Sequence, residues 1–262
     1  MSSVCYWFSG TGNSLYTAQR AAEVIEGMRL VPITRSLADN PPRLEGDVVG
    51  LVFPVYAYGP PAIIRRFLGN AEIGEVGYLF SALTHGGGPA NAALKLNEIT
   101  DLKGIAVDAT FLIRMPSNYV TGSNPITGAK LKSVLATSED QLEAMCALLK
   151  SRTSFSSKSG GIGGRLKSWA IHPLFMRGLK HVDRKFTIDP GCTGCGICTK
   201  VCPMENITLD DNKRPVWHGA CEYCLGCINA CPERAIQTGS LTRRRGRYRH
   251  PEIPIKRLMT RK

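Results

Sequence analysis

Apolar and polar positions follow two different periods along the first 150 residues. Short apolar runs bounded by Gly, Pro or Asn predict buried strands at residues 4–8, 30–33, 47–55, 76–83 and 105–113. Apolar residues spaced three or four apart predict helices at residues 13–28, 60–68, 89–96 and 138–150. Pro60 and Pro61 suit a first helical turn, and Ser138 with Gln141 forms a capping box. Five strands separated by helices predict a doubly wound α/β domain with a parallel sheet.

The composition changes after this domain. Residues 156–164 read SSKSGGIGG, which predicts a flexible linker. A basic stretch with scattered apolar residues follows, and we expect a connecting helix there that packs against one domain. Attachment to a membrane surface is the alternative, although Pro173 interrupts a long amphipathic face. The predicted divisions are an α/β domain at 1–152, a basic linker with a helix at 153–185, a second domain at 186–240 and a basic tail at 241–262.

The charge of the chain is concentrated in two segments. The net charge is +12. Residues 150–185 and 240–262 each hold nine Lys and Arg against one acidic residue, whereas residues 1–149 and 186–239 are each slightly acidic. No apolar run approaches the roughly 18 residues that span a bilayer, and the N-terminus lacks the pattern of a signal peptide. We therefore expect a cytoplasmic protein without a transmembrane segment.

Eight of the ten cysteines lie within residues 192–231, in two runs of the form C-x₂-C-x₂-C-x₃-C-P. The runs are Cys192, Cys195, Cys198 and Cys202, then Cys221, Cys224, Cys227 and Cys231. Structural zinc sites usually use two cysteine pairs with a longer spacer, and disulfide frameworks are typical of secreted proteins. Three thiolates at successive x₂ spacing instead suit three corners of an iron–sulfur cubane. Cys5 and Cys146 fall in a predicted strand and helix, where small core residues are expected.

This spacing resembles that of bacterial two-cluster ferredoxins at every position, including Pro203 and Pro232. The resemblance implies two 4Fe–4S clusters that exchange their fourth ligands between the runs. One cluster would be held by Cys192, Cys195, Cys198 and Cys231, and the other by Cys221, Cys224, Cys227 and Cys202. Gly194 and Gly196 would let backbone N–H groups approach the sulfides.

A glycine loop, FSGTGNS at residues 8–14, stands between the first strand and the first helix. It lacks the lysine of a Walker A loop, and Leu15 replaces the third glycine of a dinucleotide fingerprint. Its hydroxyls and backbone N–H groups at a helix start suit a terminal monophosphate. The loop resembles the FMN phosphate loop of flavodoxins, S/T-x-T-G-x-S/T. The matching residues are Ser9, Gly10, Thr11, Gly12, Asn13 and Ser14.

Two further loops follow the third and fourth predicted strands, where flavodoxin-like folds bind their ligand. The first loop contains Pro54, Val55, Tyr56, Ala57, Tyr58 and Gly59, and the second contains Thr84, His85, Gly86 and Gly87. Both suit an isoalloxazine ring, which needs a stacking face and close backbone contact. The stacking residue stays open between Tyr56, Tyr58 and Tyr119. His85 is either a cation beside the flavin or an unengaged side chain.

Together these segments resemble the flavodoxin–ferredoxin fusion family, and the resemblance extends to residues 115–119 and 215–217. It implies a five-stranded parallel sheet of order 2-1-3-4-5, followed by a small α+β ferredoxin-like domain with two clusters. The implied function is intracellular electron transfer between a redox partner, two 4Fe–4S clusters and FMN. The alternative is an FMN-dependent reductase of a quinone, disulfide or similar substrate, but no nucleophile–base pair or nicotinamide-binding domain is evident. The basic segments would dock an acidic redox protein, with nucleic-acid binding or a solvated tail as alternatives.

Overall fold

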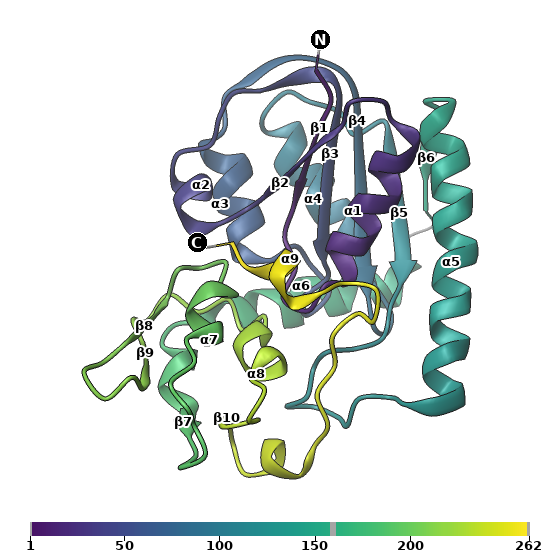
Figure 1. The fold of residues 1–262 in the computed structure, drawn as a ribbon. Helices are drawn as coiled ribbons and strands as arrows, with labels where there is room; N and C mark the ends of the chain where they lie inside the picture. The colour runs from purple at the N-terminus through teal and green to yellow at the C-terminus, as the bar shows by residue number, and fades with distance from the viewer. Residues whose placement is uncertain (1, 158–160, 261–262) are drawn as a thin grey trace.

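The N-terminal domain is built on a six-stranded parallel sheet. The structure, a computed structural model, describes residues 2–157 and 161–260. The strand order is β2-β1-β3-β4-β5-β6 (Figure 1). The strands are β1 (Val4–Trp7), β2 (Arg29–Pro32), β3 (Leu44–Pro54), β4 (Ile73–His85), β5 (Ala109–Arg114) and β6 (Phe155–Ser156). The predicted order 2-1-3-4-5 is confirmed, and β6 adds a short edge strand beside β5.

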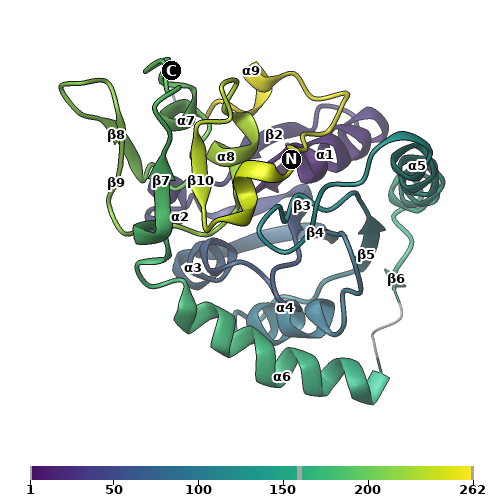
Figure 2. The same ribbon diagram turned by 90° about the horizontal axis from the view of Figure 1, so that it is seen from below.

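Helices cover both faces of this sheet. On one face lie α1 (Asn13–Val24) and α5 (Gly128–Lys150), and on the other lie α2 (Arg35–Asp39), α3 (Ala62–Asn70) and α4 (Ala92–Asp101) (Figure 2). Strand β1 serves both cores because its side chains alternate between the faces. Cys5 and Trp7 pack with the core under α1 and α5, whereas Val4 and Tyr6 pack with the core under α3 and α4. A strand that is buried on both faces has a continuous apolar run in its sequence, and residues 4–7 form such a run.

The predicted start of the last helix of this domain is wrong. Helix α5 begins at Gly128, so Ser138 lies within it and is buried. The Ser138 hydroxyl donates to the carbonyl of Val134 at 2.8 Å and to that of Arg114 at 2.5 Å. A serine that donates to a carbonyl one turn back does not cap a helix. The predicted capping box is instead a contact that fixes α5 on the end of β5.

The fifth strand and the short second helix also differ from the prediction. Strand β5 begins at Ala109, so residues 105–108 stand outside it. Helix α2 was not predicted, and it starts where the Thr34 hydroxyl accepts a hydrogen bond from the Leu37 N–H at 3.3 Å. An N-cap of this kind fixes a helix too short to show an apolar period.

Helix α6 (Gly161–Gly178) connects the two domains, and Figure 2 shows it along the outer side of α3 and α4. Residues 158–160 of the predicted flexible linker lie outside the described residues, but residues 161–164 are helical, so the prediction is wrong there. Gly164 packs closely on Asn91, since a Cβ at this glycine would lie 3.1 Å from the Asn91 Oδ1. The helix continues through Pro173 and buries Ser168 and His172 against the domain. It is therefore a packed connection, as expected for residues 165–178.

The second domain consists of short elements below the carboxyl ends of the sheet (Figure 1). The 3₁₀ turn η1 (Val182–Lys185) leads into β7 (Phe186–Ile188), which pairs antiparallel with β10 (Ile236–Thr238). Strands β8 (Ile207–Leu209) and β9 (Pro215–Trp217) form a second antiparallel pair. Helix α7 (Ile197–Lys200) contains Cys198, and α8 (Gly226–Ala230) contains Cys227. Among the described helices, none has the length and apolarity needed to cross a membrane.

The end of the chain returns to the N-terminal domain. After η2 (Leu241–Arg244), residues 245–258, here called the C-terminal strap, run past the start of α1 and end in α9 (Ile255–Leu258) (Figure 1). Ile253 and Leu258 are buried in the core under α1. The His250 N–H donates to the Thr11 carbonyl at 2.9 Å. This part of the predicted tail is packed rather than solvated, and its alternating basic residues concealed the two apolar anchors.

Candidate cofactor sites

A cavity of about 580 Å³ lies beyond the carboxyl ends of β1, β3, β4 and β5. The size is that of a cofactor or small-molecule site. The three predicted loops contribute Ser9, Gly10, Thr11, Asn13, Ser14, Pro54, Val55, Tyr56, Ala57, Tyr58, Thr84, His85, Gly86 and Gly87, and the loop after β5 contributes Tyr119. Two predicted residues do not line it. Gly12 packs against His250 and Ile253 of the strap, and Gly59 packs against the His172 ring.

The loop at residues 9–14 presents an open helix start to this cavity. Gly12 is the N-cap of α1, with the left-handed φ of 103° that favours glycine, and no side chain caps the helix. The Gly12 N–H is bonded to the Ser9 hydroxyl at 3.0 Å, and the Ser14 and Thr84 hydroxyls lie 2.8 Å apart. The first turn of α1 carries no acidic side chain. Uncapped N–H groups and the helix dipole together favour an anion at this place.

The loop after β3 forms a tight turn. Tyr56 and Gly59 exchange backbone hydrogen bonds of 2.9 and 3.1 Å across Ala57 and Tyr58, which both have positive φ. Two non-glycine residues in this conformation are strained, so the surroundings must hold them. Helix α6 does this, because the Ser168 hydroxyl donates to the Tyr58 carbonyl at 3.0 Å. Helix α6, which the sequence indicates only as a connection, therefore also shapes the cavity.

Helix α6 also supplies an apolar wall. Ile171, Leu174 and Phe175 line the cavity, and the Phe175 ring meets the Tyr56 ring edge-on at 6.4 Å. The Tyr56 hydroxyl is buried without a partner among the described residues. Tyr119, by contrast, is about half exposed at the rim and meets Tyr223 edge-on.

His85 lies in the cavity wall with its Nδ1 against the Gly87 carbonyl. Burial lowers the pKa of His85, and the bond to Gly87 opposes that shift only in part. A lowered pKa favours the neutral imidazole over the cation.

The eight clustered cysteines surround two separate small cavities. One is lined by Cys192, Cys195, Cys198 and Cys231, and the other by Cys202, Cys221, Cys224 and Cys227. The last cysteine of each run thus lies with the first three of the other run. The two loops repeat one backbone shape, since Gly194 and Gly196 have φ of 69° and 71° and the matching Tyr223 and Leu225 have 55° and 57°. Cys5 and Cys146 are buried in the core under α1 and α5, as expected.

The second cysteine loop touches the loop at residues 9–14 directly. A Cβ on Gly10 would collide with the Cys224 carbonyl oxygen, and one on Gly226 would lie 2.9 Å from the Gly10 carbonyl oxygen. The Glu222 carboxylate accepts the Ala62 N–H at 3.0 Å, at the start of α3. Burial raises the pKa of Glu222 to about 7, and the backbone donors oppose this. The cysteine loop and the cavity loop therefore form one continuous wall.

A chain of amide and hydroxyl contacts fastens the same region. The Asn118 side chain donates to the Cys224 carbonyl at 3.3 Å, and the Asn229 side chain donates to the Asn118 carbonyl at 3.3 Å. Asn229 in turn accepts the Tyr248 N–H at 2.9 Å, and the Tyr248 hydroxyl donates to the Asn13 Oδ1 at 2.8 Å. Through Tyr248, the strap therefore connects the loop at residues 9–14 with Asn229 of α8.

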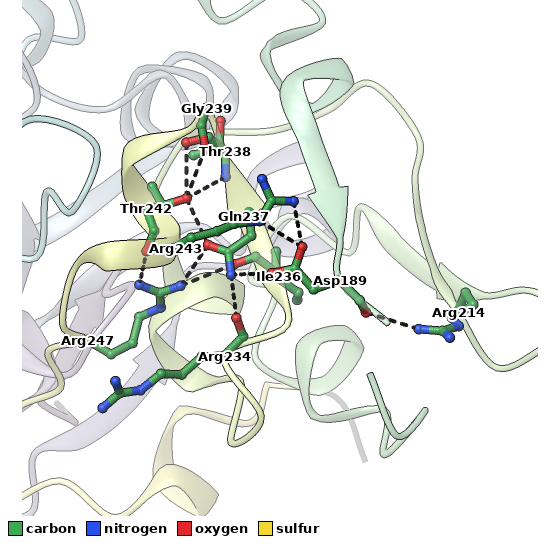
Figure 3. A network of polar contacts seen from close by, with 10 residues as sticks. All are labelled: Asp189, Arg214, Arg234, Ile236, Gln237, Thr238, Gly239, Thr242, Arg243 and Arg247. Atoms are coloured by element: carbon green, nitrogen blue, oxygen red, sulfur yellow. Dashed lines mark hydrogen bonds and ion pairs between the residues drawn. The ribbon is translucent and has the colours of Figure 1, made fainter. Parts of the chain in front are cut away.

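Two arginines of the basic C-terminal region are used within the domain. Figure 3 shows Arg243 on the Asp189 carboxylate, at 2.6 and 3.0 Å. This guanidinium lowers the pKa of Asp189. Arg247 donates to the carbonyls of Ile228 and Thr242 at 3.1 and 2.9 Å. These side chains hold η2 and the start of the strap on the cysteine domain. They therefore contribute less to a free basic surface than the sequence suggests.

Comparison with known proteins assigns the cysteine region. Residues 185–232 match the family model described as a 4Fe-4S dicluster domain. The chain is 31% identical over 67 residues to one component of the ion-translocating oxidoreductase complex of Methanosarcina acetivorans, covering 26% of this chain and 25% of that protein. It is 35% identical over 51 residues to a ferredoxin of Pyrobaculum islandicum, covering 19% of this chain and 47% of that protein. The chain thus spans a quarter and about half of the lengths of these two curated relatives.

A solved structure resembles the other domain only weakly. The FMN-dependent NADH-azoreductase of Bacillus anthracis, solved in complex with FMN, aligns with 57% of this chain and 100% of its own length at 10% identity and a TM-score of 0.38. That value carries no functional argument. The fold follows from the sheet itself, whose order 2-1-3-4-5 is that of flavodoxin. The chain therefore joins a domain of flavodoxin-like fold to a C-terminal domain of the 4Fe-4S dicluster family.

Proposed function

We propose that this protein relays electrons between a redox partner protein, two 4Fe–4S clusters and FMN, within the cytoplasm. The observation that carries the proposal is the direct contact between Gly10, in the loop for the FMN phosphate, and the Cys224 carbonyl. Tyr223, between two cysteines of the same loop, lines the cavity meant for the flavin. A cluster and a flavin held at these places share one wall, which suits electron transfer between them.

FMN fits the cavity by its chemistry. The uncapped start of α1 and the hydroxyls of Ser9, Thr11 and Ser14 suit its phosphate, and the absence of an acidic side chain in the first turn avoids repulsion. The aromatic and aliphatic side chains of the other loops suit its ring. When bound, FMN would accept or give one or two electrons, whereas an iron–sulfur cluster exchanges one at a time.

The two cysteine cavities suit one cluster each. Cys192, Cys195, Cys198 and Cys231 would hold the first, and Cys221, Cys224, Cys227 and Cys202 the second. Left-handed backbone at the residues between the cysteines turns the loop around each cavity. Such a turn lets main-chain N–H groups face sulfides, as the ligation of these clusters requires.

An acidic redox protein remains the proposed partner. Arg244, Arg249, Lys256 and Arg257 are exposed on or beside the strap, which lies near both cofactor sites. A basic surface attracts an acidic protein over long range and raises the association rate. Because the strap is packed, this idea is tested by the salt dependence of the reaction rather than by deletion.

The test is anaerobic reconstitution followed by reduction. We expect protein reconstituted with iron, sulfide and FMN to retain all three, and reduced acidic ferredoxin to reduce the clusters and then the flavin. The observed rate should fall as salt rises, which stopped-flow spectroscopy measures. Iron uptake without any bound FMN would refute the flavin half of the proposal, and bound FMN without iron would refute the cluster half.

One observation favours a reductase as the second candidate. The cavity has an apolar wall of Ile171, Leu174 and Phe175 that is not part of the flavin loops, and an apolar substrate suits such a wall. A quinone or disulfide would take up two electrons and two protons there, with the electrons supplied by reduced ferredoxin. Steady turnover of a quinone by the reconstituted protein would establish this activity. Reduction of the flavin without quinone turnover would instead favour the electron-relay function.

Tyr248→Phe should weaken FMN binding about fivefold. The lost hydroxyl fixes Asn13, and a single hydrogen bond contributes about 1 kcal/mol. Titration of the FMN-free protein followed by flavin fluorescence measures the dissociation constant. The control is Tyr78→Phe, which removes a hydroxyl bonded to the Thr153 carbonyl at 2.9 Å, away from the cavity. Equal affinity in the two variants would contradict a role of the strap in flavin binding.

A further inference from the structure

Trp217 stands where the two halves of the cysteine domain meet. It ends β9, between the two cysteine runs, and its side chain lines the cavity of Cys202, Cys221, Cys224 and Cys227. The ring packs edge-on against Phe186, with centroids 5.4 Å apart. This packing fixes the position of the indole ring at the cavity wall.

The indole N–H of Trp217 is a buried donor without an acceptor. Among the described residues nothing accepts its hydrogen bond, and the nitrogen has no access to water. Buried N–H groups almost always have a partner, so an orphan at the wall of a cavity points to what fills that cavity. The sequence placed Trp217 only within the general resemblance and gave it no role.

Neighbouring polar groups do not need this donor. The Asn206 side chain donates to Asp183 at 2.8 Å and accepts the N–H groups of His218 and Ala220 at 3.1 and 2.7 Å. Asp183 also accepts the Gly219 N–H at 2.8 Å. These donors engage the Asn206 amide and the Asp183 Oδ2 atom, and neither group is bonded to the indole. Trp217 also lines an open cavity with His181 and Gly219, but its indole nitrogen has no access to water and so does not open onto that cavity. The acceptor that suits the indole is therefore a sulfur atom of a bound cluster.

The other cysteine cavity has no such group. Among its lining residues that the structure describes, none carries a buried side-chain donor without a partner. Leu209, Lys213 and Pro215, from the same β8–β9 hairpin that carries Trp217, form part of its wall, and Cys195 is exposed. Of the two cavities, the one lined by Cys202 therefore has a buried, unpartnered side-chain donor, and the other cavity serves as an internal reference.

We propose that the Trp217 indole N–H donates a hydrogen bond to a sulfur of the cluster held by Cys202, Cys221, Cys224 and Cys227, and that this bond raises the reduction potential of that cluster. The inference rests on the proposed function, since it requires both clusters. Reduction adds one electron to the cluster and makes its sulfurs more negative, so a donor stabilises the reduced form more than the oxidised form. Trp217 thus tunes the cluster next to the flavin cavity.

The first test is Trp217→Phe in the fully reconstituted protein. Phenylalanine keeps the aromatic packing on Phe186 and removes the N–H. We expect an about tenfold shift of one cluster's redox equilibrium toward the oxidised form, which is about 59 mV for a one-electron couple. Anaerobic titration followed by electron paramagnetic resonance measures both clusters, and the other potential should stay unchanged. Trp169→Phe is the matched control, because Trp169 is largely exposed on α6 and lines no cysteine cavity.

A second measurement needs no substitution. In protein labelled with ¹⁵N at tryptophan, the reduced cluster should show a ¹⁵N coupling from an indole nitrogen, and the equally labelled Trp217→Phe variant should lack this ¹⁵N coupling. Unchanged potentials in Trp217→Phe, equal shifts of both clusters, or a labelled protein without coupling would each overturn the inference. A protein that binds no iron would instead refute the proposed function, so the two failures are distinguishable.

Discussion

Replacing Cys202 by alanine should remove the cluster of the second cysteine run and leave the first, although Cys202 belongs to the first run in sequence. The reason is the shared cavity of Cys202 with Cys221, Cys224 and Cys227. Cys202→Ala and Cys221→Ala should therefore give the same residual spectrum. Cys231→Ala and Cys192→Ala should instead keep only the spectrum of the cluster of the second cysteine run, since both residues line the first cavity.

Iron analysis and electron paramagnetic resonance of the reduced proteins check this grouping. Each single variant should keep about half of the wild-type iron, because each cluster has its own four ligands. Cys5→Ala and Cys146→Ala should keep all of it, since both thiols are buried in the core of the other domain. If Cys202→Ala and Cys192→Ala share one spectrum, the fourth ligands are not exchanged. A loss of all iron in every variant would mean that the clusters assemble only together.

The cysteine sites were predictable because their information is local. Seven residues from Cys192 to Cys198 hold three thiolates at fixed spacing, and two glycines supply the left-handed backbone. The second run needs the same shape but uses Tyr223 and Leu225, which no propensity would select for positive φ. The buried neighbours of Leu225 hold that conformation, and neighbours distant in sequence are invisible to a local pattern.

The meeting of the three loops at one cavity was predictable for a similar reason, but the far wall of the cavity was not. Each loop follows a strand that the apolar pattern identified, and parallel strands bring their carboxyl ends to one edge. Leu174 and Phe175 come from a helix predicted only as a connection, since nothing in its own period shows what it covers. Ile253 and Leu258 were not recognised for the converse reason, because two isolated apolar residues in a basic segment produce no helical or strand period.

Gly10→Ala should separate the two cofactors without removing either. The backbone of Gly10 is not in the left-handed region, so alanine is conformationally allowed, and the effect arises from contact alone. Its Cβ would collide with the Cys224 carbonyl and lie 3.1 Å from the Cys224 Cβ. Overpacking against this carbonyl costs about 1–3 kcal/mol, because a backbone oxygen cannot turn aside as the end of a flexible side chain can.

We expect Gly10→Ala to retain its iron, to bind FMN several-fold more weakly and to transfer electrons from the clusters to the flavin more slowly. Denaturant unfolding measures the stability loss, and stopped-flow reduction by ferredoxin measures the transfer. Gly87→Ala is the matched control, since Gly87 lines the same cavity and a Cβ there would meet nothing within 4 Å. Identical transfer rates in the two variants would mean that electrons do not pass through the contact of Gly10 with Cys224. A slower rate in Gly10→Ala alone, with both cofactors bound, would place the electron path at this contact, because both substitutions add one methyl group beside the same cavity and only that of Gly10 meets Cys224.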